Sequence, residues 1–210
     1  MASAIIHIAV ANEINKTLKK DEQKFLIGSI APDIAKQIGM TKVLSHFQDK
    51  DDSIPNLDKF LNKYKDKLND PFILGYYVHL YTDYLWFKYF IPELYDDDSS
   101  MIKKLNGEVI KCNGDMEKLY IYNDYTNLNR KVIDEYNLNL KIFYNSPPEF
   151  ENGIDEIPMD KIDVLLDKMG LIISKTNEHK NFVFDITNIK KFVSTSVDII
   201  LSDINERIGV

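Results

Sequence analysis

A mostly apolar stretch, residues 75–87, carries two side chains whose types and spacing could do chemistry. His79 and Asp83 stand four residues apart, so in a helix they share one face, and Gly75 lies on that face one turn earlier. Leucine, valine and aromatic residues surround them, which indicates a buried helix. Because an unpartnered buried carboxylate is costly, the two residues either satisfy each other or bind a common metal ion. Gly75 has no side chain and would let another segment approach the backbone.

Three further residues favour the metal interpretation. His7 interrupts the apolar face of the first expected helix, Asp33 follows a Gly-Ser-Ile-Ala-Pro sequence, and His46 lies between Ser45 and Phe47. Three histidines and two aspartates from separate segments are difficult to satisfy in pairs. Such nitrogen and oxygen donors form zinc or mixed two-metal sites, and helical bundles draw metal ligands from facing helices. The alternative is a His–Asp hydrogen-bond network that ties the helices together.

The elements that must position these residues are helices, because apolar residues recur mostly with helical spacing. Ser3 and Asp21 are expected N-caps of the first two helices, and Asp70-Pro71 is a strong start signal for the buried one. A period-two alternation is suggested only at 182–184. Helices are expected over 4–14 and beyond, from 22 to near 32, from 56 or 58 to about 68, over 71–90, 115–136, 159–174 with an end or bend at Gly170, and 187–207. Loops are expected over 50–55, 96–100 and 144–158.

The fold class predicted from this pattern is all-α, an irregular multi-helix bundle. With 210 residues, 44% of them hydrophobic, the chain is expected to form a single domain over 1–210. Its metal-site core would span about 1–136, and the C-terminal helices over 159–207 would pack on that core.

Composition excludes several function classes. A single cysteine, Cys112, excludes a disulfide framework and a cysteine-based metal cluster. The net charge of −7, with only Arg130 and Arg207 as arginines, argues against nucleic acid as a partner. The sequence does not begin with a basic residue followed by an uninterrupted apolar run, so we expect no signal peptide. It has no apolar run of about 18 residues, so we expect no transmembrane segment and a cytoplasmic location.

The order of these motifs resembles the zinc-dependent phospholipase C family, an all-α fold shared with zinc-dependent single-strand nucleases. The resemblance covers about the first 90 residues. Its matching pieces are His7, Gly28-Ser-Ile-Ala-Pro-Asp33, Ser45-His46-Phe47 and Gly75-Tyr-Tyr-Val-His79-Leu-Tyr-Thr-Asp83. It implies that Asp33, His46 and His79 hold one zinc ion, that His7 holds a second and that Asp83 bridges the two. It also implies Asp33 as the catalytic general base.

The sequence departs from the family pattern at the other ligands. The family's N-terminal tryptophan, which supplies an amine and a carbonyl, is missing, and after Asp83 only His179 remains in place of the third-site residues. We therefore expect one or two Zn²⁺ ions, or other divalent metals. Asp124, between Asn123 and Tyr125, is a candidate replacement ligand for the second site. The alternative for Asp124 is an exposed acid that caps a helix or pairs with a lysine.

These observations lead to three functional hypotheses. The first is a zinc-dependent phosphoric ester hydrolase that uses a metal-bridging hydroxide on a phosphodiester or phospholipid-like substrate, with a small phosphoester or lipid headgroup as its partner. The second is a non-catalytic helical module held by a structural metal or a His–Asp network. The third is a single-strand nuclease, which the acidic net charge disfavours.

Overall fold

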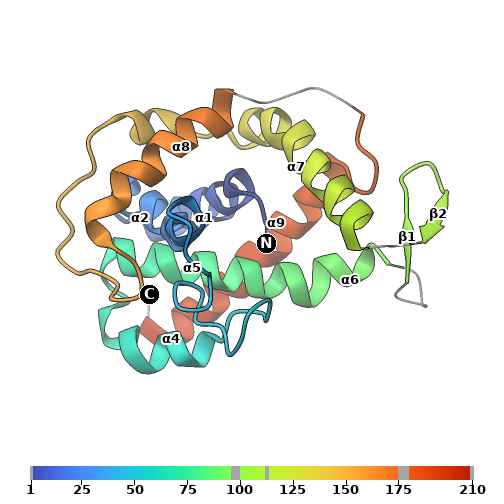
Figure 1. Ribbon diagram of the computed structural model, residues 1–210. Coiled ribbons are helices and arrows are strands. Elements are labelled where there is room, and N and C mark those ends of the chain that lie inside the picture. Colours follow the sequence, from blue (N-terminus) through green and yellow to red (C-terminus); the bar gives the residue numbers. More distant parts are fainter. Residues whose placement is uncertain (1, 96–99, 112–113, 175–179, 209–210) are drawn as a thin grey trace.

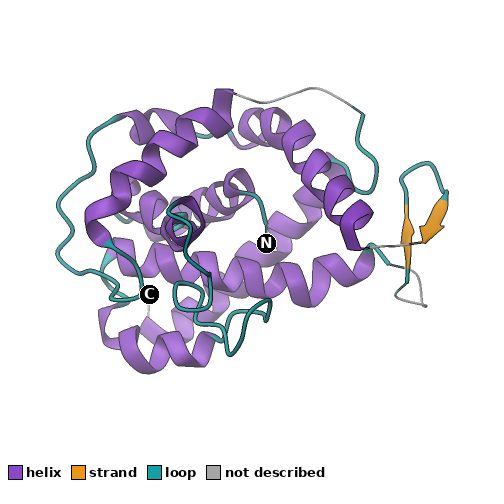
Figure 2. Ribbon diagram, viewed as in Figure 1, coloured by secondary structure: helices purple, strands orange, loops and turns teal. Residues whose placement is uncertain are grey.

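The chain folds as an all-α, multi-helix protein with one small hairpin (Figures 1 and 2). The computed structural model describes residues 2–95, 100–111, 114–174 and 180–208. Short 3-10 turns flank several helices at 31–33, 65–67, 140–144 and 159–161. The α-helices are α1 (Ala4–Leu18), α2 (Glu22–Gly28), α3 (Ile34–Gln37), α4 (Leu57–Tyr64), α5 (Pro71–Leu85), α6 (Ile91–Glu93), α7 (Gly114–Tyr136), α8 (Ile162–Ser174) and α9 (Ile186–Ile208).

Four helices begin where capping residues predict. The side chains of Ser3, Asp21, Asn56 and Asp70 each accept a backbone N–H from the first turn of the helix that follows. Asn56, rather than Asp58, is therefore the cap of α4. The residue at which a helix begins sets which side chains share each of its faces, including the faces that carry candidate ligands.

Helix α5 is enclosed by the rest of the bundle, as its apolar sequence predicts. Every residue from Phe72 to Leu80 is buried, and α5 packs against α1, α2, α4 and α9. In Figure 1, α1 and α2 lie in the middle of the view, with α7 and α8 above and α5 below. The expected helix over 71–90 is not uniform, because α5 passes into a π-helical turn over Trp86–Phe90 before α6.

Helices α2 and α5 touch backbone to backbone at two glycines. A Cβ atom on Gly75 would lie 2.1 Å from the carbonyl oxygen of Phe25, and one on Gly28 would lie 2.3 Å from that of Phe72. Neither distance is compatible with a side chain, so both positions require glycine. The expectation that a segment approaches Gly75 is confirmed, and the segment is the end of α2, which includes Ser29.

Three local expectations were wrong. The hairpin of β1 (Met101–Lys103) and β2 (Val109–Lys111) was missed, because its strands are too short for a periodic signal, although Asn106-Gly107 is a common hairpin turn sequence. Residues 182–184 form no strand. Helix α8 does not end at Gly170 but continues to Ser174, and a Cβ on that glycine would meet only the Tyr144 ring, at 3.5 Å. Of the expected polar break at 96–100, residues 96–99 lie outside the described part.

None of the helices in the described ranges is both long and apolar enough to cross a bilayer. The expected absence of a transmembrane helix is confirmed for those ranges.

Candidate metal centre

Five of the six predicted ligands converge at the centre of the bundle. His79 and Asp83 come from α5, His7 from α1, Asp33 from the turn after α2, and His46 from the loop between α3 and α4. Their ligand atoms form two groups, each within 4.8 Å: Asp33, His46 and His79, and His7, His79 and Asp83. Four of the five residues are fully buried, and only the Asp33 side chain, 13% exposed, reaches solvent. These groups could hold a metal ion.

Three of the ligand atoms lie at distances typical of a metal site, and a fourth lies beside one of them. His46 Nε2 lies 3.2 Å from His79 Nε2, and both nitrogens lie 3.6–3.7 Å from Asp83 Oδ2. Asp33 Oδ1 lies 3.7 Å from His46 Nε2. A regular tetrahedron of ligands about 2.0–2.2 Å from a zinc ion has edges of about 3.3–3.6 Å. The three distances among His46 Nε2, His79 Nε2 and Asp83 Oδ2 are close to these edges, so these atoms could hold a first-row divalent ion. These three atoms and Asp33 Oδ1 are called the four-atom group below.

Hydrogen bonds on the far side of both imidazoles fix their orientation. His79 Nδ1 lies 2.8 Å from the Ser29 carbonyl oxygen. A carbonyl oxygen can only accept a hydrogen bond, so in neutral His79 the proton is on Nδ1 and the unprotonated Nε2 faces the group. His46 Nδ1 lies 2.9 Å from Ser45 Oγ. Metal-binding histidines usually donate their other N–H in this way, which sets the tautomer and the ring orientation. The close contact at Gly75 is what brings the Ser29 carbonyl to His79.

The electrostatics keep each group in its metal-binding protonation state. Burial lowers the pKa of His46 to about 4 and that of His79 well below its usual value, so both imidazoles are neutral. Burial by itself raises the pKa of the two carboxyls, but Lys42 and the neighbouring histidines together outweigh it at Asp33, and His7 and His79 help to outweigh it at Asp83, so both pKa values are lowered. Neutral imidazole and ionised carboxylate are the forms that bind metal ions.

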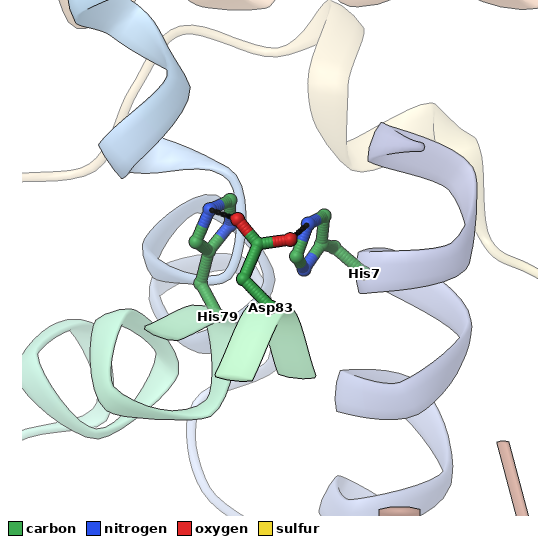
Figure 3. Close-up of side chains that lie close together, drawn as sticks. All are labelled: His7, His79 and Asp83. Carbon is green, nitrogen blue, oxygen red and sulfur yellow. Dashed lines mark ion pairs between the residues drawn. The ribbon is translucent and has the colours of Figure 1, made fainter. Parts of the chain in front are cut away.

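Asp83 lies between two imidazoles and directs one oxygen at each (Figure 3). Its Oδ1 accepts the Ala2 backbone N–H at 3.0 Å and lies 3.2 Å from His7 Nε2. Its Oδ2 is buried and has no hydrogen-bond partner among the described residues. Buried polar atoms are rarely left unsatisfied, and a cation at the four-atom group would satisfy this oxygen.

His7 belongs to a less complete group. Its ring stacks on that of His79 at 3.8 Å between centroids, and neither of its nitrogens has a hydrogen-bond partner in the described part of the chain. His79 has one nitrogen engaged by Ser29, so its remaining nitrogen can serve only one ion. Among the described histidine, cysteine and acidic side chains, a second ion would therefore have His7 and Asp83 Oδ1. The structure favours one well-formed site over two.

The loop that carries His46 is held in a strained but well-supported conformation. Phe47, the next residue, has a φ of +52°, which is uncommon for a non-glycine residue. Its ring packs edge-on against Phe60 and Tyr76, and the Tyr76 hydroxyl donates to the Ser45 carbonyl. Aromatic packing and this hydrogen bond thus hold His46 toward α5.

Asp124 is not part of the cluster, contrary to the ligand prediction. Its carboxylate accepts the backbone N–H groups of Phe182, Val183 and Phe184 at 2.7–3.1 Å, so both oxygens are already used. The alternative of an exposed acid was also wrong, because Asp124 is fully buried. Its role in the structure is to fix the chain that precedes α9.

Sequence reasoning missed the residues that surround the ligands. Ser29 acts through its carbonyl and Ser45 through its hydroxyl, and Lys42 places its ammonium 2.5 Å from Asp33 Oδ1. Nothing in the sequence distinguishes Lys42 from the other lysines. Its position one helical turn before His46, whose N–H donates to the Lys42 carbonyl, is visible only in the structure.

A cleft of about 500 Å³ opens beside the cluster at Lys42. Its apolar wall comes from the loop after α3, the π-helical turn, α6 and α7. Lys36 and Lys42 line it together with Asp51 and Asp52. The apolar lining is Met40, Phe87, Ile91, Ile121, Tyr122 and Tyr125. None of the five candidate ligands lines this cleft, but Lys42, which pairs with Asp33, links it to them.

No protein-family model, no curated protein and no solved structure matches this chain. The interpretation of the site therefore rests on its geometry and chemistry.

Proposed function

We propose that the protein is a metal-dependent hydrolase of small phosphoesters, with zinc as the expected ion. The observation that carries this proposal is the convergence of His46 Nε2, His79 Nε2 and Asp83 Oδ2 within 3.2–3.7 Å of one another, with Asp33 Oδ1 3.7 Å from His46 Nε2. The adjoining cleft supports it, and so does the resemblance of the motif order to the zinc-dependent phospholipase C family. A divalent ion at such a site polarises a phosphoryl oxygen and lowers the pKa of a water molecule.

The residues divide into buried anchors and one accessible carboxylate. His46, His79 and Asp83 are fully buried, and two imidazoles with one carboxylate form a common catalytic ligand set that leaves a position open. Asp33 is the one of the four whose side chain reaches solvent, at 13% exposed, and its carboxylate is kept ionised beside Lys42. In the proposed reaction Asp33 accepts a proton from the attacking water, the role of a general base.

The test combines metal analysis with an assay. The purified protein is expected to contain about one zinc per chain and to hydrolyse bis(p-nitrophenyl) phosphate, with chelator removing both. His79→Ala should lose the ion and the turnover. His7→Ala is the matched control, since it removes a buried imidazole outside the four-atom group, and it should keep one ion. A wild-type protein without metal or turnover after zinc loading would refute the proposal.

A second candidate function follows from the burial of the same group. If Asp33 completes the coordination, four protein ligands close the site, which is typical of a structural metal. Asp33→Ala separates the two functions. A general base predicts that the variant retains zinc and loses turnover, whereas a structural fourth ligand predicts weaker zinc binding and a less stable fold, with no turnover in the wild type.

A further inference from the structure

We propose that Lys42 is the anion-binding residue of this centre: it neutralises Asp33 while the metal is absent and engages the anionic ligand once the metal is bound. This inference rests on the proposed function, because it needs an ion at the four-atom group. It adds a specificity-determining residue outside the ligand set and defines the charge of the ligand that fits.

The position of Lys42 between two environments is the first step. Its ammonium lies 2.5 Å from Asp33 Oδ1, the oxygen that also faces His46, and its side chain lines the cleft. Lys42 is 19% exposed and Asp33 13%, so both side chains reach solvent. The side chain therefore joins the interior of the centre to the space that a substrate would occupy.

The second step is the repulsion that a bound ion would create. An ion about 2.1 Å from His46 Nε2 would lie within about 8 Å of the ammonium in its observed position, because Asp33 Oδ1 is 3.7 Å from that nitrogen and 2.5 Å from the ammonium. Two positive charges this close, in a largely buried setting, repel each other strongly. Because the lysine stem is flexible and the cleft is adjacent, the ammonium would turn toward the cleft rather than remain on the carboxylate.

The third step is the net charge of the centre. The two carboxylates and the neutral His46 and His79 of the four-atom group carry −2, a divalent ion brings the sum to 0, and Lys42 brings it to +1. A ligand with one negative charge would neutralise it. On the same cleft Asp51 and Asp52 add negative charge, which disfavours polyanions. The best-fitting ligand carries one negative charge, as a small phosphodiester or dihydrogen phosphate does, and contacts the metal with one oxygen and Lys42 with another.

Phosphate binding tests the role of Lys42 without requiring turnover. We would measure zinc content first and then titrate inorganic phosphate into zinc-loaded protein by calorimetry. Lys42→Gln should keep its zinc, bound as tightly as in the wild type or more tightly, and should bind phosphate roughly 10–100-fold more weakly, as expected for the loss of one charge-assisted hydrogen bond. Lys42→Arg should restore most of the affinity.

Lys36→Gln is the matched control, because Lys36 lines the same cleft but lies over the Tyr122 ring rather than on Asp33. Its phosphate affinity should stay within about threefold of the wild type, the range of a rim charge. Metal-free wild-type protein should bind phosphate weakly, since Lys42 is then engaged by Asp33.

Several outcomes would overturn the proposal. Equal losses in Lys36→Gln and Lys42→Gln would indicate a general charge effect, and loss of zinc from Lys42→Gln would indicate a supporting role at the metal. Undiminished phosphate binding in zinc-loaded Lys42→Gln, or no binding by the zinc-loaded wild type, would also reject it. Phosphate binding that depends on Lys42 in a protein without turnover would refute only the hydrolase function.

Discussion

Replacing Gly75 by alanine gives the most direct test of how the fold positions the metal centre. Alanine is the better helix former by about 1 kcal/mol, so at an open position in a helix the change would stabilise the protein. At Gly75, however, the new Cβ would lie 2.1 Å from the Phe25 carbonyl oxygen. The obstacle is backbone, which cannot move aside by changing rotamer, so α2 and α5 must separate by more than about 1 Å to reach ordinary contact.

The magnitude follows from two opposing terms. Inserting a methyl group into a packed core usually costs about 1–3 kcal/mol, and a contact with rigid backbone falls at or above the upper end of that range. After the gain in helix propensity, the net loss is expected to be about 2 kcal/mol. For a chain of this length that corresponds to a decrease in Tm of about 4–8 °C.

The same displacement should weaken metal binding. Separating α2 from α5 carries the Ser29 carbonyl away from His79 Nδ1, which is now 2.8 Å away, and releases the tautomer and the orientation of the ring. Losing such a supporting hydrogen bond typically reduces metal affinity about 10–100-fold. Zinc affinity would be measured by competition with a chromophoric chelator, and stability by urea unfolding of the metal-free protein.

Gly170→Ala is the matched control within α8. There the added Cβ would meet the Tyr144 ring at 3.5 Å, an ordinary contact, so we expect a gain of about 0.5–1 kcal/mol and unchanged zinc affinity. If Gly75→Ala were as stable as the wild type or more so, the inferred backbone contact between α2 and α5 would be refuted. If stability fell but zinc affinity did not, the supporting role of the Ser29 carbonyl would be rejected.

Two further predictions concern buried charges. Asp124→Ala should destabilise the protein by about 3–5 kcal/mol, because three buried N–H groups lose their acceptor, while the zinc content stays the same; loss of zinc would restore Asp124 as a ligand. Protonation linked to His46 should lower the free energy of unfolding of the metal-free protein by about 2 kcal/mol between pH 7 and pH 5. Burial lowers the pKa of His46 to about 4 in the folded chain, so below pH 6.5 the unfolded chain takes up the proton more readily. Urea unfolding at both pH values measures this loss, and a slope that is the same in His46→Asn would contradict the assignment.

The sequence was sufficient to predict most helices and to single out the five residues whose side chains lie together in the two His/Asp groups. Helix periodicity and capping residues such as Ser3 and Asp70 are local signals, and His79 and Asp83 stand out because polar groups in an apolar helix need a partner. Gly75 also gave a correct prediction, since a glycine one turn before a polar pair indicates close approach.

The remaining features depend on contacts that no local pattern encodes. Asp124 looked like a ligand because it lies among aromatic residues, but its partners are backbone amides more than fifty residues later in the chain. Lys42 resembles any other lysine until the fold places it on Asp33. The hairpin of β1 and β2 was missed because three-residue strands carry too little periodicity to be recognised.

The hydrogen bonds from Asp124 to residues 182–184 show that the candidate ligands and part of the cleft wall depend on different segments of the chain. The five clustered candidate ligands lie between residues 7 and 83. Part of the cleft wall, at Ile121, Tyr122 and Tyr125, belongs to α7. A segment more than fifty residues later supports α7, because Phe184 contacts Asp124 through its backbone N–H and Tyr125 through its ring. Substitutions in that later segment can therefore reshape the entrance without altering any atom that faces the ion. Chains with the same inner residues can in this way diverge in the molecules that they admit.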